Sequence, residues 1–273
     1  MDLPKADKAT ALLDKEYLKV LNTQYKVALD DIKVKIGKIY ERYGVDGKLD
    51  MATMQKMAVK DQKELTRLNK LFSDIDEDLN TLNRGRPQQL SGHLTSIYEA
   101  NYNDVALNVG SLTDEAFKVV NREAVYQSSL SELGKIGLQA NADAIKLNIK
   151  RSVTTSIVQG ESIGNMAKRI ATDLETNANN AVRIARTETT RIMNEARQSV
   201  LEQAADIGIK VQKKWLAAKD DRTRSSHASL DGQVRDLDKP YSNGLMFPGD
   251  KSGPASEVIN CRCKEVAYFP EYE

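Results

Sequence analysis

Residues 213–234 read KKWLAAKDDRTRSSHASLDGQV, residues 245–250 read LMFPGD and residues 259–269 read INCRCKEVAYF. The last quarter of the chain, to which these stretches belong, holds the only Trp, one of the two His, both Cys and four of the six Pro. Elsewhere the sequence reads as repetitive amphipathic helix. Because the rare residue types gather in one place, we expect this quarter to fold differently from the rest.

Within this quarter the periodicity indicates short strands. From Ile209 to Ala217 apolar and polar residues alternate, which is typical of a strand with one covered face. Residues 222–230 fit a short helix, and Asp231-Gly232 fits a tight turn into a brief strand at 233–235. Residues 236–257, with three Pro and three Gly, are expected to form a loop. Residues 258–269 alternate as a closing strand, with Cys261 and Cys263 on one face.

Upstream, apolar residues recur at steps of three and four, which predicts helices. The predicted helices cover residues 18–43, 51–82, 91–108, 113–127, 141–159, 162–174 and 178–205. Glycines at 44 and 47 favour a turn that makes the first two an antiparallel hairpin. Residues 177–180 are interpreted as a junction between the helices at 162–174 and 178–205, near the start of the C-terminal module. The predicted fold class is therefore mainly α: a long helical N-terminal region (1–84 and 85–176) followed by a small α+β C-terminal module (177–273).

The composition limits the classes of function. A net charge of +1 excludes a global affinity for polyanions, so any contact with DNA requires a local basic patch. Two Cys separated by one residue favour a reducing compartment over a disulfide framework. We expect no signal peptide, and no stretch approaches the roughly 20 apolar residues that span a bilayer. The sequence contains no glycine-rich phosphate loop, H-E-x-x-H or G-x-S-x-G motif.

The order of motifs resembles the Mu F-like minor head (head morphogenesis) proteins of tailed bacteriophages. Their module carries an ARTE-type helix, a W…D-x-R-T-R-x-x-H…DG segment, a Phe-Pro loop and a terminal CRC strand. The matching residues are Ala185, Arg186, Thr187, Glu188, Trp215, Asp220 or Asp221, Arg222, Thr223, Arg224, His227, Asp231, Gly232, Phe247, Pro248, Cys261, Arg262 and Cys263. The match covers residues 177–273, and we interpret Trp215, Asp220, Asp231, Gly232, Phe247 and Pro248 as its structural motif.

The resemblance implies a minor capsid protein that associates with the portal and assists head assembly, DNA packaging or DNA delivery. The implied partners are the phage portal protein, a capsid or scaffolding protein, and DNA bound without sequence specificity. The implied locations are the virion and, during assembly, the host cytoplasm. Some relatives of this module are fused to toxin domains with ADP-ribosyl transfer activity. Because only Lys264 to Glu273 follow the CRC strand, we expect no such domain here.

His227, Cys261 and Cys263 are the candidate metal ligands, because zinc prefers imidazole and thiolate. Asp220, Asp221 or Asp231 could provide the fourth ligand. The alternative is that both Cys pack as small hydrophobic residues while His227 hydrogen-bonds the loop. A metal-dependent enzyme centred on His227, or a thiolate paired with it, is a further hypothesis. Since no complete catalytic constellation is present, we predict no enzymatic activity.

Residues 183–224 contain ten Lys or Arg against six Asp or Glu, whereas residues 225–273 contain five against eight. A basic surface on this helix and strand would suit a portal or the DNA backbone. The predicted contact residues are Arg183, Arg186, Arg197, Lys213, Lys214, Arg222 and Arg224. A non-specific DNA-binding protein is therefore the rival function. The plainer interpretation is a solvated helix with pairs such as Arg191 and Glu195 on its surface.

Overall fold

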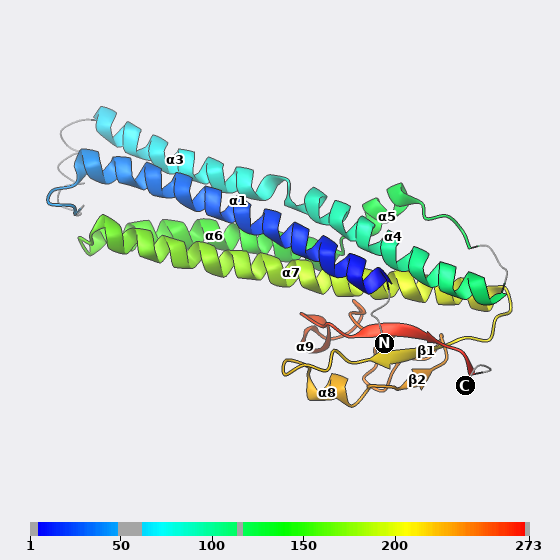
Figure 1. Ribbon diagram of the computed structural model, residues 1–273. Coiled ribbons are helices and arrows are strands. Elements are labelled where there is room, and N and C mark those ends of the chain that lie inside the picture. The colour runs from blue at the N-terminus through cyan, green and yellow to red at the C-terminus, as the bar shows by residue number, and fades with distance from the viewer. Residues whose placement is uncertain (1–4, 49–61, 114–116, 271–273) are drawn as a thin grey trace. The chain divides into compact units, whose positions relative to one another are not determined.

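A computed structural model of the chain describes residues 5–48, 62–113 and 117–270 (Figure 1). The helices are α1 (Lys5–Tyr43), α3 (Gln62–Arg84), α4 (Arg86–Thr113), α5 (Arg122–Ser128), α6 (Glu132–Val158), α7 (Ile163–Asp206), α8 (Ser225–Ala228) and α9 (Ala255–Val258). The strands are β1 (Gln212–Leu216), β2 (Val234–Arg235) and β3 (Lys264–Tyr268). The prediction of a mainly helical chain with a small C-terminal α+β module is confirmed. Among the described helices, none is long and apolar enough to span a bilayer.

The chain forms two compact units, each built from separated segments. Unit 1 consists of Met1–Tyr17, Pro87–Lys135 and Arg183–Glu273, and unit 2 of Leu18–Arg86 and Ile136–Val182. The long helices α1 and α7 contribute residues to both units. These units cut across the predicted ranges 1–84, 85–176 and 177–273, because helices distant in sequence share each interior.

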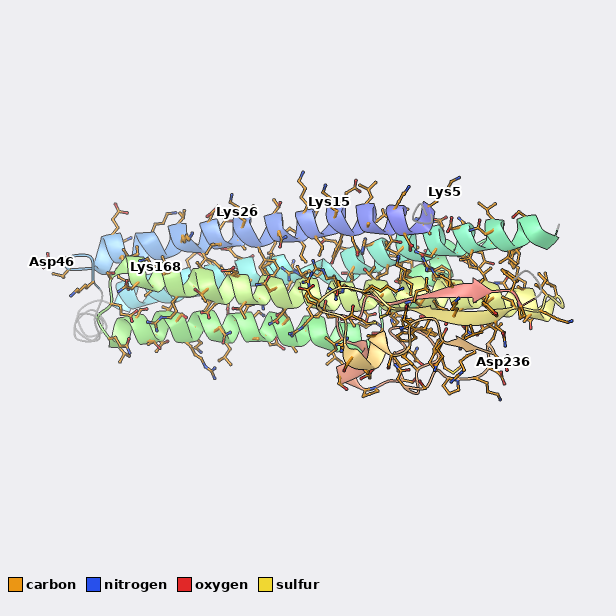
Figure 2. The ribbon with its side chains drawn as sticks, turned by 60° about the horizontal axis from the view of Figure 1, so that its bottom comes forward. Lys5, Lys15, Lys26, Asp46, Lys168 and Asp236 are labelled. Carbon is orange, nitrogen blue, oxygen red and sulfur yellow. The ribbon has the colours of Figure 1, made fainter. Side chains whose placement is uncertain are left out.

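Unit 2 is helical, and its parts of α1, α3, α6 and α7 lie side by side (Figure 1). The turn after α1 is confirmed: the Val45 N–H donates to Lys48 O at 2.8 Å, and Gly47 adopts a left-handed φ of 71°. Lys35 of α1 bonds Asp78 of α3, as the predicted hairpin requires. The first half of the helix expected at 51–82 lies outside the described residues. Lysines such as Lys26 project outward from α1 into solvent (Figure 2).

In unit 1 the three strands form an antiparallel sheet in the order β2-β1-β3. Trp215 of β1 pairs with Glu265 of β3, and Lys214 pairs with Val234 of β2. The predicted alternation along β1 is confirmed, since Lys213 and Trp215 are buried between half-buried neighbours. One apolar cluster of Val109, Leu201, Ala204 and Val211 joins α4, α7 and the residue before β1. A second cluster lies within the module: Trp215, Leu230, Tyr241, Leu245, Val258, Cys261 and Cys263.

Three predicted elements were wrong. The junction at 177–180 does not exist, because Asn177 lies inside the continuous helix α7. Its amide is buried and bonds the Tyr25 hydroxyl at 2.6 Å and Asn141 Oδ1 at 2.8 Å, so this polar residue pairs across helices rather than ending one. Of the helix expected at 113–127, residues 114–116 lie outside the described residues and 117–121 are not helical. The helix α5 begins at Arg122, where the Asn121 side chain caps the Ala124 N–H at 3.1 Å. The predicted loop at 236–257 contains the start of α9.

Candidate functional site

The structure brings the three predicted metal ligands together. The Nδ1 atom of His227 lies 3.5 Å from the sulfur of Cys261 and 3.5 Å from the sulfur of Cys263. One ligand atom from each residue lies within 4.8 Å of the other two, and all three side chains are buried. This is the only such cluster of His, Cys, Asp or Glu among the residues that the structure describes.

Short elements position these side chains. His227 belongs to α8, and its Nε2 lies 2.9 Å from a carboxylate oxygen of Glu257, which is in α9. Contrary to prediction, the two Cys precede β3 rather than lie within it. The residue before them, Asn260, has a left-handed φ of 57°, a conformation that short polar side chains tolerate. The turn at Asn260 therefore replaces the first part of the expected strand.

Aromatic rings close the cluster. The indole of Trp215 meets the His227 ring edge to face, with ring centres 5.3 Å apart, and meets the Tyr241 ring in the same way at 5.0 Å.

The Cys263 N–H donates to the Cys261 sulfur at 3.4 Å. The hydrogen bond between the thiols raises the pKa of Cys261 and lowers the pKa of Cys263 to about 5, and burial acts against that lowering. Cys263 is thus the more readily ionised thiol.

The three aspartates considered as fourth ligands lie outside the cluster. Asp220 accepts bonds from the Arg222 N–H at 3.0 Å and from Arg262 at 2.7 Å. Asp231 accepts from the Ala217 N–H at 3.0 Å, just before the Gly232 turn with its φ of 80°. Asp221 is exposed. Among the described residues, the fourth-ligand hypothesis therefore has no support, and Asp220 and Asp231 fix turns instead.

The Phe247-Pro248 loop lies against α7. Asn194 donates from its side-chain amide to Pro248 O at 2.9 Å and to Cys263 O at 3.2 Å. Gly249 follows with a φ of 87°, and a Cβ on it would lie 3.0 Å from the Arg191 nitrogen. The loop therefore packs directly on the helix backbone.

Only some of the predicted basic contact residues lie at the surface. Arg183, Arg186 and Arg222 are exposed, and Lys214 and Arg224 are half-buried. Arg197 and Lys213 are buried, so they are removed from the predicted contact set. Arg197 bonds Asp7 at 2.7 Å and Glu265 O at 3.0 Å, and Lys213 donates to Met246 O at 2.7 Å. Burial lowers the pKa of Lys213.

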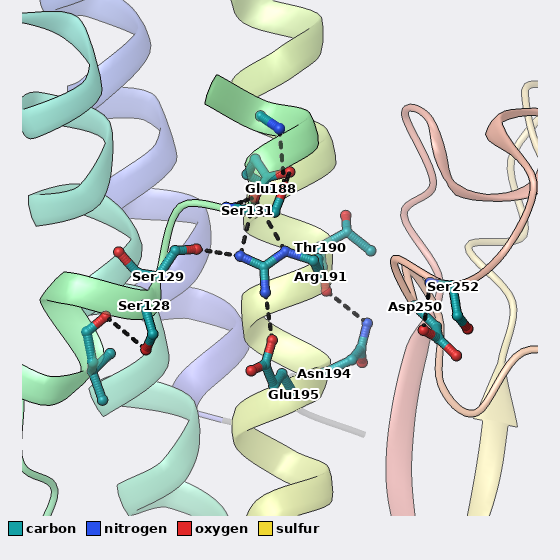
Figure 3. A network of polar contacts seen from close by, with 12 residues as sticks. Ser128, Ser129, Ser131, Glu188, Thr190, Arg191, Asn194, Glu195, Asp250 and Ser252 are labelled. Carbon is teal, nitrogen blue, oxygen red and sulfur yellow. Dashed lines mark hydrogen bonds and ion pairs between the residues drawn. The ribbon is translucent and has the colours of Figure 1, made fainter. Parts of the chain in front are cut away.

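The pair of Arg191 and Glu195 is not a solvated surface pair either. Arg191 is buried, and its guanidinium bonds Glu188, Glu195 and Ser129 O (Figure 3). Glu188 also accepts from the Ser131 hydroxyl at 2.7 Å, which ties α7 to the start of α6. Sequence reasoning missed this network, although the spacing of Glu188, Arg191 and Glu195 places all three on one side of a helix.

Comparison with known proteins gave a family and three relatives. Residues 147–266 match the model described as phage Mu protein F like protein. A segment of 256 residues, 90% of this chain, is 28% identical to minor head protein GP7 of Bacillus phage SPP1 and covers 80% of it. A segment of 126 residues, 45% of this chain, is 36% identical to NAD(+)–arginine ADP-ribosyltransferase EFV of Enterococcus faecalis.

The third relative is an uncharacterized protein of Haemophilus influenzae, 29% identical over 125 residues, or 46% of this chain. The chain spans only 26% of the Enterococcus protein and 25% of the Haemophilus protein, so similarity to them is confined to a part of each. No solved structure gives a significant match.

Proposed function

The chain belongs to the phage Mu protein F-like family, and from that premise we propose that it is a minor head protein that associates with the portal of a tailed bacteriophage. As a member of a phage head protein family it is a virion component. It assists head assembly, DNA packaging or DNA delivery, and it is present in the host cytoplasm while the head assembles. Its partners are the portal protein and a capsid or scaffolding protein.

One observation carries this proposal. The similarity to the SPP1 minor head protein extends over 90% of this chain, so it includes the long helices as well as the C-terminal module. The similarity to the ADP-ribosyltransferase extends over 45% of the chain and a quarter of that enzyme. A role shared with the whole phage protein therefore has more support than an activity shared with a segment of the enzyme.

The role is structural rather than enzymatic. A nucleophilic thiol has to meet its substrate. Cys261 and Cys263 are each only 2% exposed and belong to the same apolar cluster as Trp215. His227, the other member of a thiolate pair, is equally enclosed. A substrate would reach this cluster only after the module opened.

Arg183 and Arg186 are the best candidates for the contact with the portal. They are exposed on α7 at a spacing of three residues, which places both on one side of the helix. Exposed cations at the rim of an interface steer association and give it salt dependence. An acidic surface on the portal is the complementary partner.

Co-purification tests this contact. The full chain is co-expressed with the tagged portal protein of the same genome, and the amount retained is compared with that of the double variant Arg183→Glu/Arg186→Glu. Two charge reversals are expected to lower retention about tenfold or more, which corresponds to about 1.4 kcal/mol. The matched control is Lys15→Glu/Lys26→Glu on α1, where both lysines are exposed (Figure 2). Equal retention of all three proteins, each with native circular dichroism, would contradict the proposed contact.

Non-specific DNA binding is the second candidate, because five of the predicted basic residues keep some exposure. If each neutralised one phosphate, the logarithm of the affinity would fall with the logarithm of salt at a slope of about −4.5. Fluorescence anisotropy with a short duplex between 50 and 200 mM salt measures that slope. A slope near that value, with binding lost in the Arg183→Glu/Arg186→Glu variant and portal retention unchanged in it, would favour this candidate.

A further inference from the structure

The two distances from the His227 nitrogen to the sulfurs of Cys261 and Cys263 match those around a tetrahedral ion. With zinc–sulfur bonds of about 2.3 Å and a zinc–nitrogen bond of about 2.0–2.1 Å, a tetrahedral angle separates sulfur from nitrogen by about 3.6 Å. The structure has 3.5 Å from Nδ1 to each sulfur. We propose that these three residues bind a zinc ion that holds the C-terminal module together.

The imidazole is already oriented for such a bond. Its Nε2 lies 2.9 Å from Glu257, whose carboxylate also accepts from the Ser226 hydroxyl at 3.2 Å. A carboxylate acceptor fixes the proton of a neutral imidazole on Nε2, and this leaves the Nδ1 lone pair directed at the sulfurs. Histidines that bind metals almost always donate their other N–H to a carboxylate, a carbonyl or water. Glu257 is therefore a positioning residue for the ion.

Without a metal, the cluster contains more donors than acceptors. Both thiols face the one Nδ1 lone pair, and a thiol sulfur is only a weak acceptor. The buried Trp215 Nε1–H, whose ring meets the imidazole, has no hydrogen-bond partner. Thiolates are much better acceptors than thiols, and zinc binds the thiolate form. Metal binding would remove the two thiol protons, so the cluster would no longer contain more donors than acceptors.

The backbone also fits a pair of thiolates. The Cys263 N–H points at the Cys261 sulfur, and a hydrogen bond to the charged form stabilises it. The Thr190 hydroxyl donates to Cys261 O at 2.6 Å and the Asn194 amide to Cys263 O, so α7 holds both residues in place. These contacts fix the two sulfurs on one side of the chain although the spacing is C-x-C.

Two other chemistries use the same atoms. A nucleophilic Cys263 activated by His227 and Glu257 would need an accessible sulfur, which the burial opposes. A Cys261–Cys263 disulfide would have to close across a single residue, and both Cys are free in the structure. The experiments below therefore distinguish a nucleophilic Cys263 and a disulfide from zinc binding.

The first measurement is the metal content of the purified full chain, grown with supplementary zinc and freed of loose metal by gel filtration. We expect about one zinc per chain in the wild type and in the His93→Asn variant, which changes the other His. Cys261→Ser, Cys263→Ser and His227→Asn should lose the ion. Glu257→Gln should keep the ligands but weaken zinc affinity about 10- to 100-fold. Cobalt in place of zinc should give a thiolate-to-cobalt charge-transfer band.

The second measurement remains informative if the ligand variants fail to fold. Trp215 is the only Trp and its ring touches that of His227, so its fluorescence reports on the cluster. In the wild type, a high-affinity chelator should change this fluorescence, and added zinc should restore it. A folded chain that takes up neither zinc nor cobalt and shows no fluorescence response would overturn the proposal. So would a Cys261–Cys263 disulfide found by mass spectrometry, or rapid alkylation of Cys263 that zinc does not slow.

Discussion

Replacing Arg197 with Met tests how firmly the sheet of unit 1 is fixed to α7. The side chain is only 4% exposed, and its guanidinium makes four hydrogen bonds: two to Asn101 Oδ1, one to Asp7 and one to Glu265 O. Met has a similar unbranched stem and fills most of the same volume, so the change removes the charge without a large cavity. The change in the free energy of unfolding therefore measures the loss of the buried polar contacts of Arg197.

The expected loss of stability follows from the buried groups that the change to Met leaves without a partner. Asp7 keeps Lys264 at 2.7 Å and is not left alone. Asn101 Oδ1 and Glu265 O lose the guanidinium, and each buried acceptor without a partner costs about 1–3 kcal/mol. Removing one member of a buried ion pair costs about 3–5 kcal/mol, which agrees with that sum. We therefore expect the variant to lose about 3–5 kcal/mol of the free energy of unfolding of unit 1.

Urea unfolding followed by Trp215 fluorescence is the assay, because this Trp lies in the same unit. In thermal unfolding of a domain of this size, the same loss corresponds to a decrease in Tm of about 6–20 °C. The control is Arg186→Met on the same helix, where the side chain is exposed and the effect should stay within about 0.5 kcal/mol. If the Arg197 variant lost no more than the control, the buried contacts of Arg197 would not stabilise the sheet, and the reasoning would be refuted.

Three further changes have expected outcomes. Asn177→Ala should destabilise unit 2 by about 2–4 kcal/mol in thermal unfolding by circular dichroism, since it leaves the Tyr25 hydroxyl and Asn141 short of partners, whereas Asn179→Ala on the exposed side should be nearly neutral. Gly249→Ala should cost about 1–3 kcal/mol more than Gly232→Ala, because both glycines have positive φ but only Gly249 lies against the α7 backbone. Burial raises the pKa of Asp7, but Lys264 and Arg197 outweigh it and hold that pKa below its usual value. This stabilisation is present above the unfolded pKa and is lost as the pH falls through the folded one, so Asp7→Asn should be less stable than wild type at pH 7 and lose less between about pH 4 and 2.

The sequence was informative wherever a local pattern carried the structure. Alternation around Trp215 predicted β1 and its covered face, and steps of three and four predicted α1 and α6. The grouping of His227 with the two Cys could be suspected because zinc ligands are rare residue types that here occur close together in sequence. The distances between their atoms could not be predicted, since they depend on the turn at Asn260.

The errors at Arg197, Lys213, Arg191 and Asn177 share a physical cause. Sequence patterns place charged and amide side chains at the surface or at junctions, because such residues are rarely buried without partners. Arg197 finds Asp7 at a sequence separation of 190, and Asn177 finds Tyr25 at a separation of 152. No periodicity in one helix reveals a partner that lies so far along the chain. Only the fold decides whether a polar residue in a helix is solvated or paired.

The buried polar residues of α7 also explain why the module occupies a single position on the helix. Thr190 donates to Cys261 O, Asn194 bonds Cys263 O and the Glu265 N–H, and Arg197 donates to Glu265 O. Steps of four and three place these residues in one stripe along α7. An apolar stripe would tolerate a slide of the sheet by one turn, whereas a slide here would leave several buried groups unpaired at once. We infer that this stripe sets the register of the segment carrying Cys261 and Cys263, and so keeps both sulfurs facing His227.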